Sequence, residues 1–142
     1  MLVSTRGRYA LRVMIDLAEH VAGGYIPMKD VAQRQGISLK YMERIMPLLV
    51  KGKLVDAVQG KGGGYRLEKS PWDISVGEIL RLTEGSLAPI ACLEPDAPIC
   101  PHVEECRTLS MWKGFQAMAD AYFNGITIGD LMRADPGDQY VI

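Results

Sequence analysis

The cysteines of this chain are gathered in one proline-rich segment. All three, Cys92, Cys100 and Cys106, lie within "ACLEPDAPICPHVEECRTL", residues 91–109 of the 142-residue sequence. Three thiols cannot all pair as disulfides, and thiolates are common ligands of iron–sulfur clusters and of zinc. In a reducing compartment, cysteines clustered in this way point to metal or redox chemistry.

The N-terminal sequence indicates such a compartment. Arg12 and Asp16 interrupt its first apolar run, and no small-residue cleavage site of a signal peptide follows. No stretch approaches the roughly 20 apolar residues of a membrane span. With 48% hydrophobic and 23% charged residues, the composition is that of a soluble globular protein. We therefore expect a cytoplasmic protein with no membrane partner.

Charge is divided unevenly along the chain. Residues 1–69 carry 12 Lys and Arg against 6 Asp and Glu, whereas residues 70–142 carry 4 against 11. A basic half favours a polyanionic partner such as nucleic acid, and the acidic half would face away from it. Chance clustering of solvated charge is the alternative.

The basic half begins with a strongly periodic helix. Asp16 falls largely off its apolar face. That face, which we expect to be buried, consists of Ala10, Val13, Met14, Leu17, Ala18 and Val21.

Two further helices follow, with a tight turn between them. The pattern predicts a short helix over 28–35 that Gly36 stops, and Ser38 is a good N-cap for the next helix. Pro47 lacks an amide hydrogen, so we expect this second helix to end near Met46 and one more turn to restart at the proline. A short helix, a tight turn and a helix with polar residues near its start form a helix-turn-helix.

A β-hairpin is predicted directly after this motif. The segment "LVDAVQGKGGGYRL" has apolar ends around a glycine-rich tip at Gly60–Gly64. A phosphate-binding loop is disfavoured because Lys61 precedes the glycines and a strand follows them. A hairpin in this place is a wing, so the fold class is mainly α with a small β-wing.

The C-terminal half is expected to supply a dimerisation helix. After a short helix over 75–82 and the cysteine segment, a longer helix over 108–123 carries one bulky apolar stripe, which the chain offers no second core to cover. The stripe consists of Met111, Trp112, Phe115, Met118, Ala119 and Tyr122. Packing against a second copy buries it most economically, and packing back onto its own domain is the alternative.

These elements divide the chain into four parts. Residues 1–84 form a winged helix-turn-helix domain, and residues 85–107 form a cysteine-containing sensor loop. Residues 108–135 hold the dimerisation helix and a short final helix, and residues 136–142 form a flexible tail. No nucleophile–base pair or pair of catalytic carboxylates stands out, so an enzyme is not expected.

Five stretches carry a resemblance to a known family. They are "STRGRYALRVMIDLA", "QGISLKYMERIMPLLVKGKLV", "GKGGGYRL", "SVGEIL" and "ITIGDLM". In this order they closely resemble the Rrf2 family of bacterial winged-helix transcription regulators, over almost the whole chain. The resemblance implies a homodimer that reads a pseudo-palindromic site in double-stranded promoter DNA, in agreement with the helix-turn-helix.

The expected DNA contacts follow from the positions of polar residues on these elements. Base readout falls to the start of the second helix of the motif, where an arginine fork matches a guanine edge and a carboxylate can accept from a cytosine amino group. The candidates there are Ser38, Lys40, Tyr41, Glu43 and Arg44. Phosphate contacts are expected from Arg6, Arg8 and Lys51, and groove or phosphate contacts at the wing from Gln59 and Lys61.

Within the family the cysteines match those of the iron–sulfur cluster regulators in order and position. That resemblance implies a [2Fe-2S] or [4Fe-4S] cluster held by Cys92, Cys100 and Cys106. The sequence departs from those relatives at the fourth ligand, because Leu109 and Arg8 stand where they have a histidine or an aspartate. His102 is the closest strong replacement. Glu94, Glu104 or Glu105, or an open position, are the alternatives, and zinc, a thiol–disulfide sensor or a metal-free relic remain alternatives to the cluster itself.

The last residues suggest a second partner. The end of the chain, Tyr140, Val141 and Ile142, resembles the tails of serine acetyltransferases, whose terminal carboxylate enters cysteine synthase (O-acetylserine sulfhydrylase). The cysteine-metabolism repressor branch of the family lacks the three cysteines and forms a complex with that enzyme. A repressor controlled by cysteine synthase is therefore the alternative function, and an ordinary frayed tail is the competing interpretation.

Overall fold

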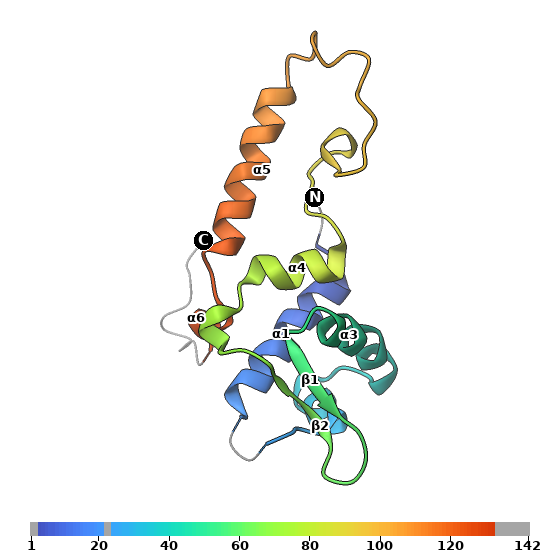
Figure 1. Ribbon diagram of the computed structural model, residues 1–142, viewed down its shortest axis with the longest axis vertical. Coiled ribbons are helices and arrows are strands. Elements are labelled where there is room, and N and C mark those ends of the chain that lie inside the picture. The colour runs from blue at the N-terminus through green and yellow to red at the C-terminus, as the bar shows by residue number, and fades with distance from the viewer. Residues whose placement is uncertain (1–2, 22–23, 133–142) are drawn as a thin grey trace.

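The computed structural model describes residues 3–21 and 24–132. It is mainly helical, with one two-stranded antiparallel sheet, as the sequence predicts (Figure 1). The helices are α1 (Thr5–Glu19), α2 (Met28–Gln35), α3 (Leu39–Lys51), α4 (Val76–Glu84), α5 (Leu109–Asn124) and α6 (Ile128–Leu131). The strands are β1 (Val55–Val58) and β2 (Gly64–Leu67), and Pro71–Asp73 and Ala91–Leu93 form single 3₁₀ turns.

Helix α1 lies at the centre of the core. Five of the six residues predicted for its buried face are at most 2% exposed, namely Ala10, Val13, Met14, Leu17 and Ala18. Val21 is 55% exposed, so that part of the prediction is wrong. It lies beyond the last turn of α1, where the helical spacing no longer applies.

The prediction is also wrong for Asp16, which is buried although exposure is expected. The helical spacing places its side chain off the apolar face. The guanidinium of Arg34 donates to both Asp16 carboxylate oxygens, at 2.7 and 3.0 Å, and Gln35 Nε2 donates at 2.9 Å. A buried carboxylate is tolerated when it is paired and hydrogen-bonded in this way. Asp16 therefore ties α1 to the C-terminal end of α2.

The predicted helix-turn-helix is present. Gly36 ends α2 with φ of 65°, a left-handed conformation that favours glycine, and Ser38 Oγ accepts from the Tyr41 amide at 3.1 Å to cap α3. The predicted break at Pro47 is wrong, because α3 continues through it to Lys51.

The continuity of α3 has a packing explanation. Its apolar residues Met42, Ile45, Met46 and Leu49 lie on both sides of the proline, and all are at most 2% exposed. Pro47 itself is exposed, and so is Glu43, whose carbonyl loses its helical partner. At the surface, water can donate a hydrogen bond to this carbonyl. The burial of the apolar residues holds both halves of α3 on one axis.

The hairpin is also where the sequence places it. Val55 pairs with Leu67 and Val58 with Gly64, so the turn runs over residues 59–63 and Gly64 belongs to β2. The backbone of Tyr65 exchanges two hydrogen bonds of 2.8 Å with Ile26, which fastens the wing to the segment between α1 and α2.

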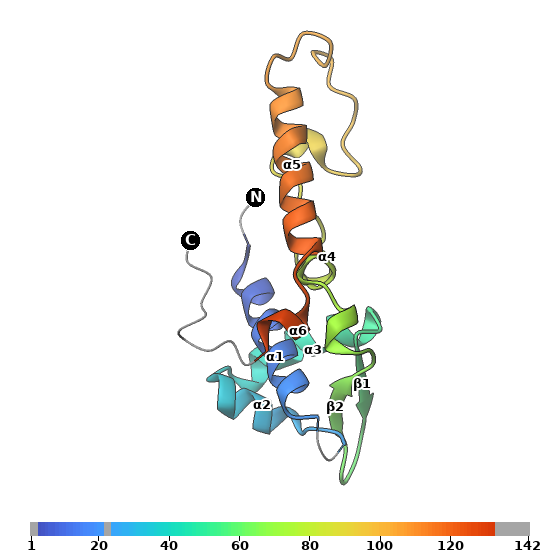
Figure 2. The same cartoon turned by 90° about the vertical axis from the view of Figure 1, so that its left-hand side faces the viewer.

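The C-terminal elements build an arm on this domain. Helix α4 buries Val76, Ile79 and Leu80, as predicted. From its end the loop 85–108 runs outward to the far end of α5, which returns toward the domain and leads into α6 (Figures 1 and 2). The cysteine segment and the wing turn therefore lie at opposite ends of the molecule.

Candidate DNA-reading surface and cysteine cavity

Polar side chains gather around the first turns of α3. Ser38, Lys40, Tyr41 and Arg44 line one shallow cavity of about 240 Å³. Ser38, Lys40 and Arg44 are exposed, and Tyr41 is half-buried. The N-terminal end of a helix also presents amide groups and a partial positive charge, which favours anions. Four of the five residues predicted to read bases thus line one cavity, and the fifth, Glu43, is exposed on the same helix.

Tyr41 is held from α1. The Tyr9 ring meets the Tyr41 ring at a centroid distance of 5.3 Å and an interplanar angle of 70°. The Arg12 guanidinium lies over the Tyr9 ring at 5.1 Å and donates to the backbone oxygen of Gln35. Tyr9 is not among the residues that the sequence singles out for DNA contact. In the sequence, the spacing of three positions between Tyr9 and Arg12 indicates that the two side chains share one face of the helix and can contact each other.

The other predicted DNA contacts are exposed at separate places. Arg6 and Arg8 lie in the first turns of α1, and Lys51 is the last residue of α3. Gln59 and Lys61 lie in the wing turn. Each is free of the core, and none lines the cavity at α3.

Asp16 holds the end of α2 next to this surface. Burial raises the pKa of its carboxyl, but hydrogen bonds from Arg34 and Gln35, with the charge of Arg34, outweigh burial and hold the pKa below its usual value. The carboxylate thus stays ionised beside the turn between α2 and α3.

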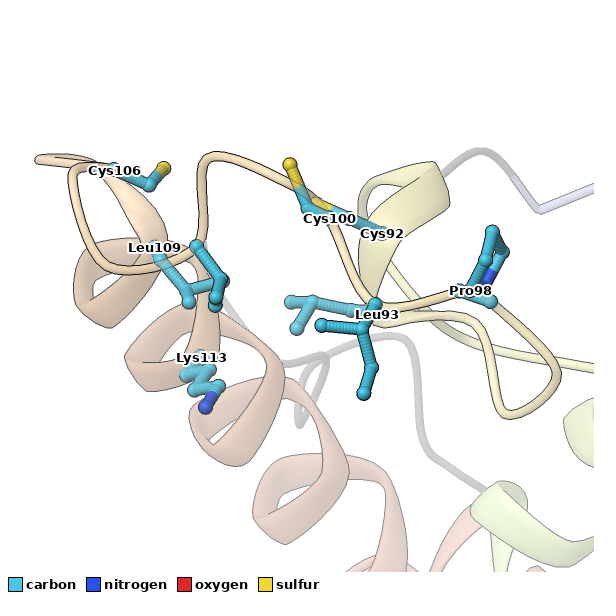
Figure 3. A pocket seen from close by; sticks show the side chains of 10 residues that line it. Cys92, Leu93, Pro98, Cys100, Cys106, Leu109 and Lys113 are labelled. Atoms are coloured by element: carbon cyan, nitrogen blue, oxygen red, sulfur yellow. The ribbon is translucent and has the colours of Figure 1, made fainter.

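The three cysteines line one cavity at the end of α5. Its volume is about 220 Å³, and its other walls are mainly apolar, with Leu93, Ile99 and Leu109 among them. Figure 3 shows Cys106 and Leu109 on the α5 side and Cys92 and Cys100 across from them. All three thiols are free.

Cys106 differs chemically from the other two cysteines. Hydrogen bonding to the Thr108 side chain and backbone lowers the pKa of its thiol, which lies just before α5. The Cys106 Sγ to Thr108 Oγ1 distance is 3.7 Å. This environment favours a thiolate, the form that binds metals.

The cavity fits the donor chemistry of an iron–sulfur cluster, because three free thiols share one apolar site. Within residues 3–21 and 24–132, however, no three His, Cys, Asp or Glu side chains are placed to hold one metal ion. A cluster would therefore require the loop to bring its sulfurs closer together.

The predicted fourth ligand is not on the cavity wall. The His102 amide donates to Cys100 Sγ at 3.4 Å, but His102 is not among the lining residues, and neither are Glu94, Glu104 and Glu105. Leu109, which stands where relatives have a histidine, does line the cavity. The role of His102 stays a prediction. The tail residues Tyr140, Val141 and Ile142 lie outside the described residues.

Comparison with known proteins identifies the family. Residues 3–134 match Rrf2, described as an iron-dependent transcriptional regulator. The HTH-type transcriptional regulator IscR of Aliivibrio salmonicida is 36% identical over 132 residues, which cover 93% of this chain and 77% of that protein.

Two solved structures show the same fold. CymR, the global cysteine regulator of B. subtilis, has a TM-score of 0.74 at 30% identity, covering 92% of this chain and 95% of that one. IscR of T. potens has a TM-score of 0.72 at 32% identity, covering 100% of this chain and 93% of that one.

These relatives are regulators of transcription and not enzymes. Among the described residues, no helix has the length and apolar character needed to cross a membrane. With the family matched over nearly its whole length and the winged helix-turn-helix in place, the chain belongs to the Rrf2 family of transcriptional regulators.

Proposed function

We propose that the protein is a homodimer that binds a two-fold symmetric promoter site through α3 and the wing. The observation that carries this proposal is the gathering of Ser38, Lys40, Tyr41 and Arg44 around one exposed cavity at the start of α3. A recognition helix uses its N-terminal residues to reach base edges in the major groove.

The contacts divide by chemistry. The Arg44 fork suits guanine O6 and N7, and the exposed Glu43 carboxylate suits a cytosine amino group. Arg6, Arg8 and Lys51 carry exposed charges suited to phosphates, while Gln59 and Lys61 sit at the wing turn. Phosphate contacts make affinity fall steeply with salt concentration, whereas base contacts set which sequence is bound.

Helix α5 supports the homodimer. Four of the apolar residues on its predicted stripe are exposed, Met111 at 55%, Phe115 at 44%, Met118 at 73% and Tyr122 at 60%. No residue of α5 is buried by its own chain. A continuous exposed apolar face of this kind is typical of an interface, and two-fold symmetry would pair it with itself.

The DNA-reading proposal is tested by selecting duplexes from a random library with the full-length protein. We expect one enriched sequence with two related half-sites. Arg44→Ala and Lys40→Ala should each weaken binding to it by about tenfold. Lys69→Ala, which removes the same charge at an exposed position outside the proposed contacts, should change the affinity less than twofold. No enriched sequence, or full binding by Arg44→Ala, would contradict the proposal.

We propose that the protein senses its regulatory signal through the cysteine loop, residues 85–108. Cys92, Cys100 and Cys106 would hold an iron–sulfur cluster, [2Fe-2S] or [4Fe-4S], with His102 or an open position as the fourth ligand. Such a cluster supplies a group that can be gained, lost, oxidised or reduced. The free thiols on one cavity and the likeness to two IscR proteins support this proposal.

The loop is well placed to pass such a change on. It leaves α4 at Gly85 and ends where α5 begins, so its path affects how α5 is held against the domain. In a dimer joined through α5, a change in the orientation of α5 relative to the domain would change the distance between the two α3 helices. A coupling of about 1–3 kcal/mol between loop and DNA would change operator affinity by up to about 150-fold.

Anaerobic purification followed by a visible spectrum and iron, sulfide and zinc analysis tests the cofactor. We expect brown protein with iron and sulfide, and Cys92→Ala, Cys100→Ala or Cys106→Ala should remove both. Exposed Asp96→Asn in the same loop is the matched control and should retain them. Colourless protein after anaerobic reconstitution would contradict the cluster, and stoichiometric zinc would replace it with a zinc site.

The structural likeness to CymR supports a second candidate, a cysteine-metabolism repressor controlled by cysteine synthase at the C-terminal tail. Removing Val141 and Ile142 should abolish co-elution with that enzyme. Co-elution that survives the deletion would contradict the role of the tail. Operator binding that cysteine substitutions leave unchanged would favour this candidate over the cluster.

A further inference from the structure

We infer that Tyr9 on α1, supported by Arg12, is a positioning residue for DNA recognition that holds the Tyr41 ring in its reading orientation. This inference rests on the proposed DNA-binding function. It adds two α1 residues to a surface that otherwise consists of α3, the wing and exposed charges.

The contacts link the start of α3 to α1. Tyr41 lies in the first turn of α3 and shares its cavity with Ser38, Lys40 and Arg44. Its ring meets Tyr9 edge to face at 5.3 Å. On α1, the Arg12 guanidinium lies 5.1 Å from the centre of the Tyr9 ring.

Arg12 in turn is fixed by the end of α2. Its Nε donates to Gln35 Oε1 at 3.2 Å, and its Nη2 donates to the backbone oxygen of Gln35, the last residue of that helix. These hydrogen bonds hold the guanidinium against the end of α2, next to the turn of the helix-turn-helix. Arg12 acts in this arrangement as a support for Tyr9 rather than as a phosphate contact.

The burial of the two tyrosines supports positioning over simple core packing. Both rings are partly buried and pack against the edge of the main core, and neither is fully enclosed. A tyrosine gives a large contact area with only two rotatable bonds. Holding Tyr41 before DNA arrives removes the ordering penalty that a mobile ring would pay on binding.

If Tyr9 positions Tyr41, replacing Tyr9 should weaken only sequence-specific DNA binding. Phosphate contacts do not depend on the orientation of Tyr41, so non-specific affinity and its salt dependence should not change. General destabilisation of the domain would instead weaken specific and non-specific binding together. The ratio of the two affinities therefore separates the two roles.

The test measures affinity of the full-length protein for the selected duplex and for a scrambled duplex of equal length. Tyr9→Leu keeps apolar bulk but loses the edge-to-face contact, and we expect affinity for the selected duplex to fall about fivefold to tenfold. Affinity for the scrambled duplex and the salt slope should stay the same. Tyr9→Phe keeps the ring and should bind within twofold of the unaltered protein.

A double-mutant cycle gives the second readout. In a Tyr41→Leu background, Tyr9→Leu should have little further effect, because the ring that it positions is gone. If Tyr9→Leu does not fold, Arg12→Gln at an exposed position takes its place, with an expected threefold loss for the selected duplex only.

Three results would overturn the inference: equal losses for both duplexes, additive effects in the cycle, or full specific affinity of Tyr9→Leu. Failure of the proposed function looks different, because the unaltered protein would then not distinguish the two duplexes.

Discussion

At the scale of single residues, Asp16 shows how a charge inside the core can organise a recognition motif. The carboxylate is 1% exposed and receives donors from both Arg34 and Gln35 at the end of α2. Because the folded state lowers the pKa of Asp16, the ionised form stabilises the fold above the unfolded pKa near 4, and this stabilisation is lost as the pH falls through the folded pKa.

Asp16→Asn should lower the free energy of unfolding by about 2 kcal/mol at pH 7, since it leaves Arg34 without its carboxylate. The loss is smaller than for a fully buried pair because the Arg34 side chain is 35% exposed. Urea unfolding should show a constant deficit from pH 7 to pH 5 that narrows below about pH 4. The exposed Asp73→Asn is the control. A deficit that does not change at low pH would show that packing, not charge, dominates.

At the scale of elements, α3 is longer than its sequence predicts because its buried stripe extends beyond Pro47. Pro47 removes one helical hydrogen bond, and the surrounding core compensates for the loss. The wing likewise depends on a backbone detail, since Gly64 has φ of 152° and a side chain there would lie 2.3 Å from the Ile26 carbonyl oxygen.

Pro47→Ala should raise the free energy of unfolding by about 1 kcal/mol, because the restored amide donates to Glu43 while the unfolded chain gains some freedom. Pro71→Ala should change it by less than about 0.5 kcal/mol, because a proline that begins a helical turn lacks no bond. Urea denaturation measures both. Destabilisation by Pro47→Ala would mean that the helix is distorted there in a way that needs proline.

Gly64→Ala should destabilise the protein by about 2 kcal/mol, because the added methyl group meets the backbone of Ile26 and Pro27. At Gly62 the φ is 79° and the space is open, so Gly62→Ala should cost only about 1 kcal/mol. Thermal unfolding compares the two. Equal effects would show that backbone conformation alone, without the contact to Ile26, limits both positions.

At the scale of the whole molecule, the exposed face of α5 lies on an arm that the winged domain does not cover (Figure 2). Burying this face between two copies would set the distance between two recognition helices. Such a dimer would therefore decide which half-site spacing the protein accepts.

Met118→Asp should convert the dimer to a monomer, since it places a charge on the side chain that is 73% exposed in the middle of the stripe. Circular dichroism should show an intact fold, because α5 contributes no buried residue of its own chain. Analytical ultracentrifugation measures the mass. Ala117→Asp, on a different side of α5, should remain dimeric. A dimer that survives Met118→Asp would place the interface elsewhere.

The sequence by itself determined the local elements and the family. Helical spacing, Gly36 and Ser38 predict α2 and the start of α3 correctly, and the glycine-rich centre predicts the hairpin, because capping and turn formation act over a few residues. The candidate base-reading residues could be named for the same reason, since they occupy the first turns of one helix.

Only the tertiary structure decided what these elements do to one another. The burial of Asp16, the continuity of α3 through Pro47 and the edge-to-face contact of Tyr9 with Tyr41 each depend on partners from another helix. The cysteine cavity likewise joins residues on either side of the loop and places Leu109 on its wall. Periodicity along one chain segment reports which face is apolar, but a contact between segments depends on the packing that brings them together.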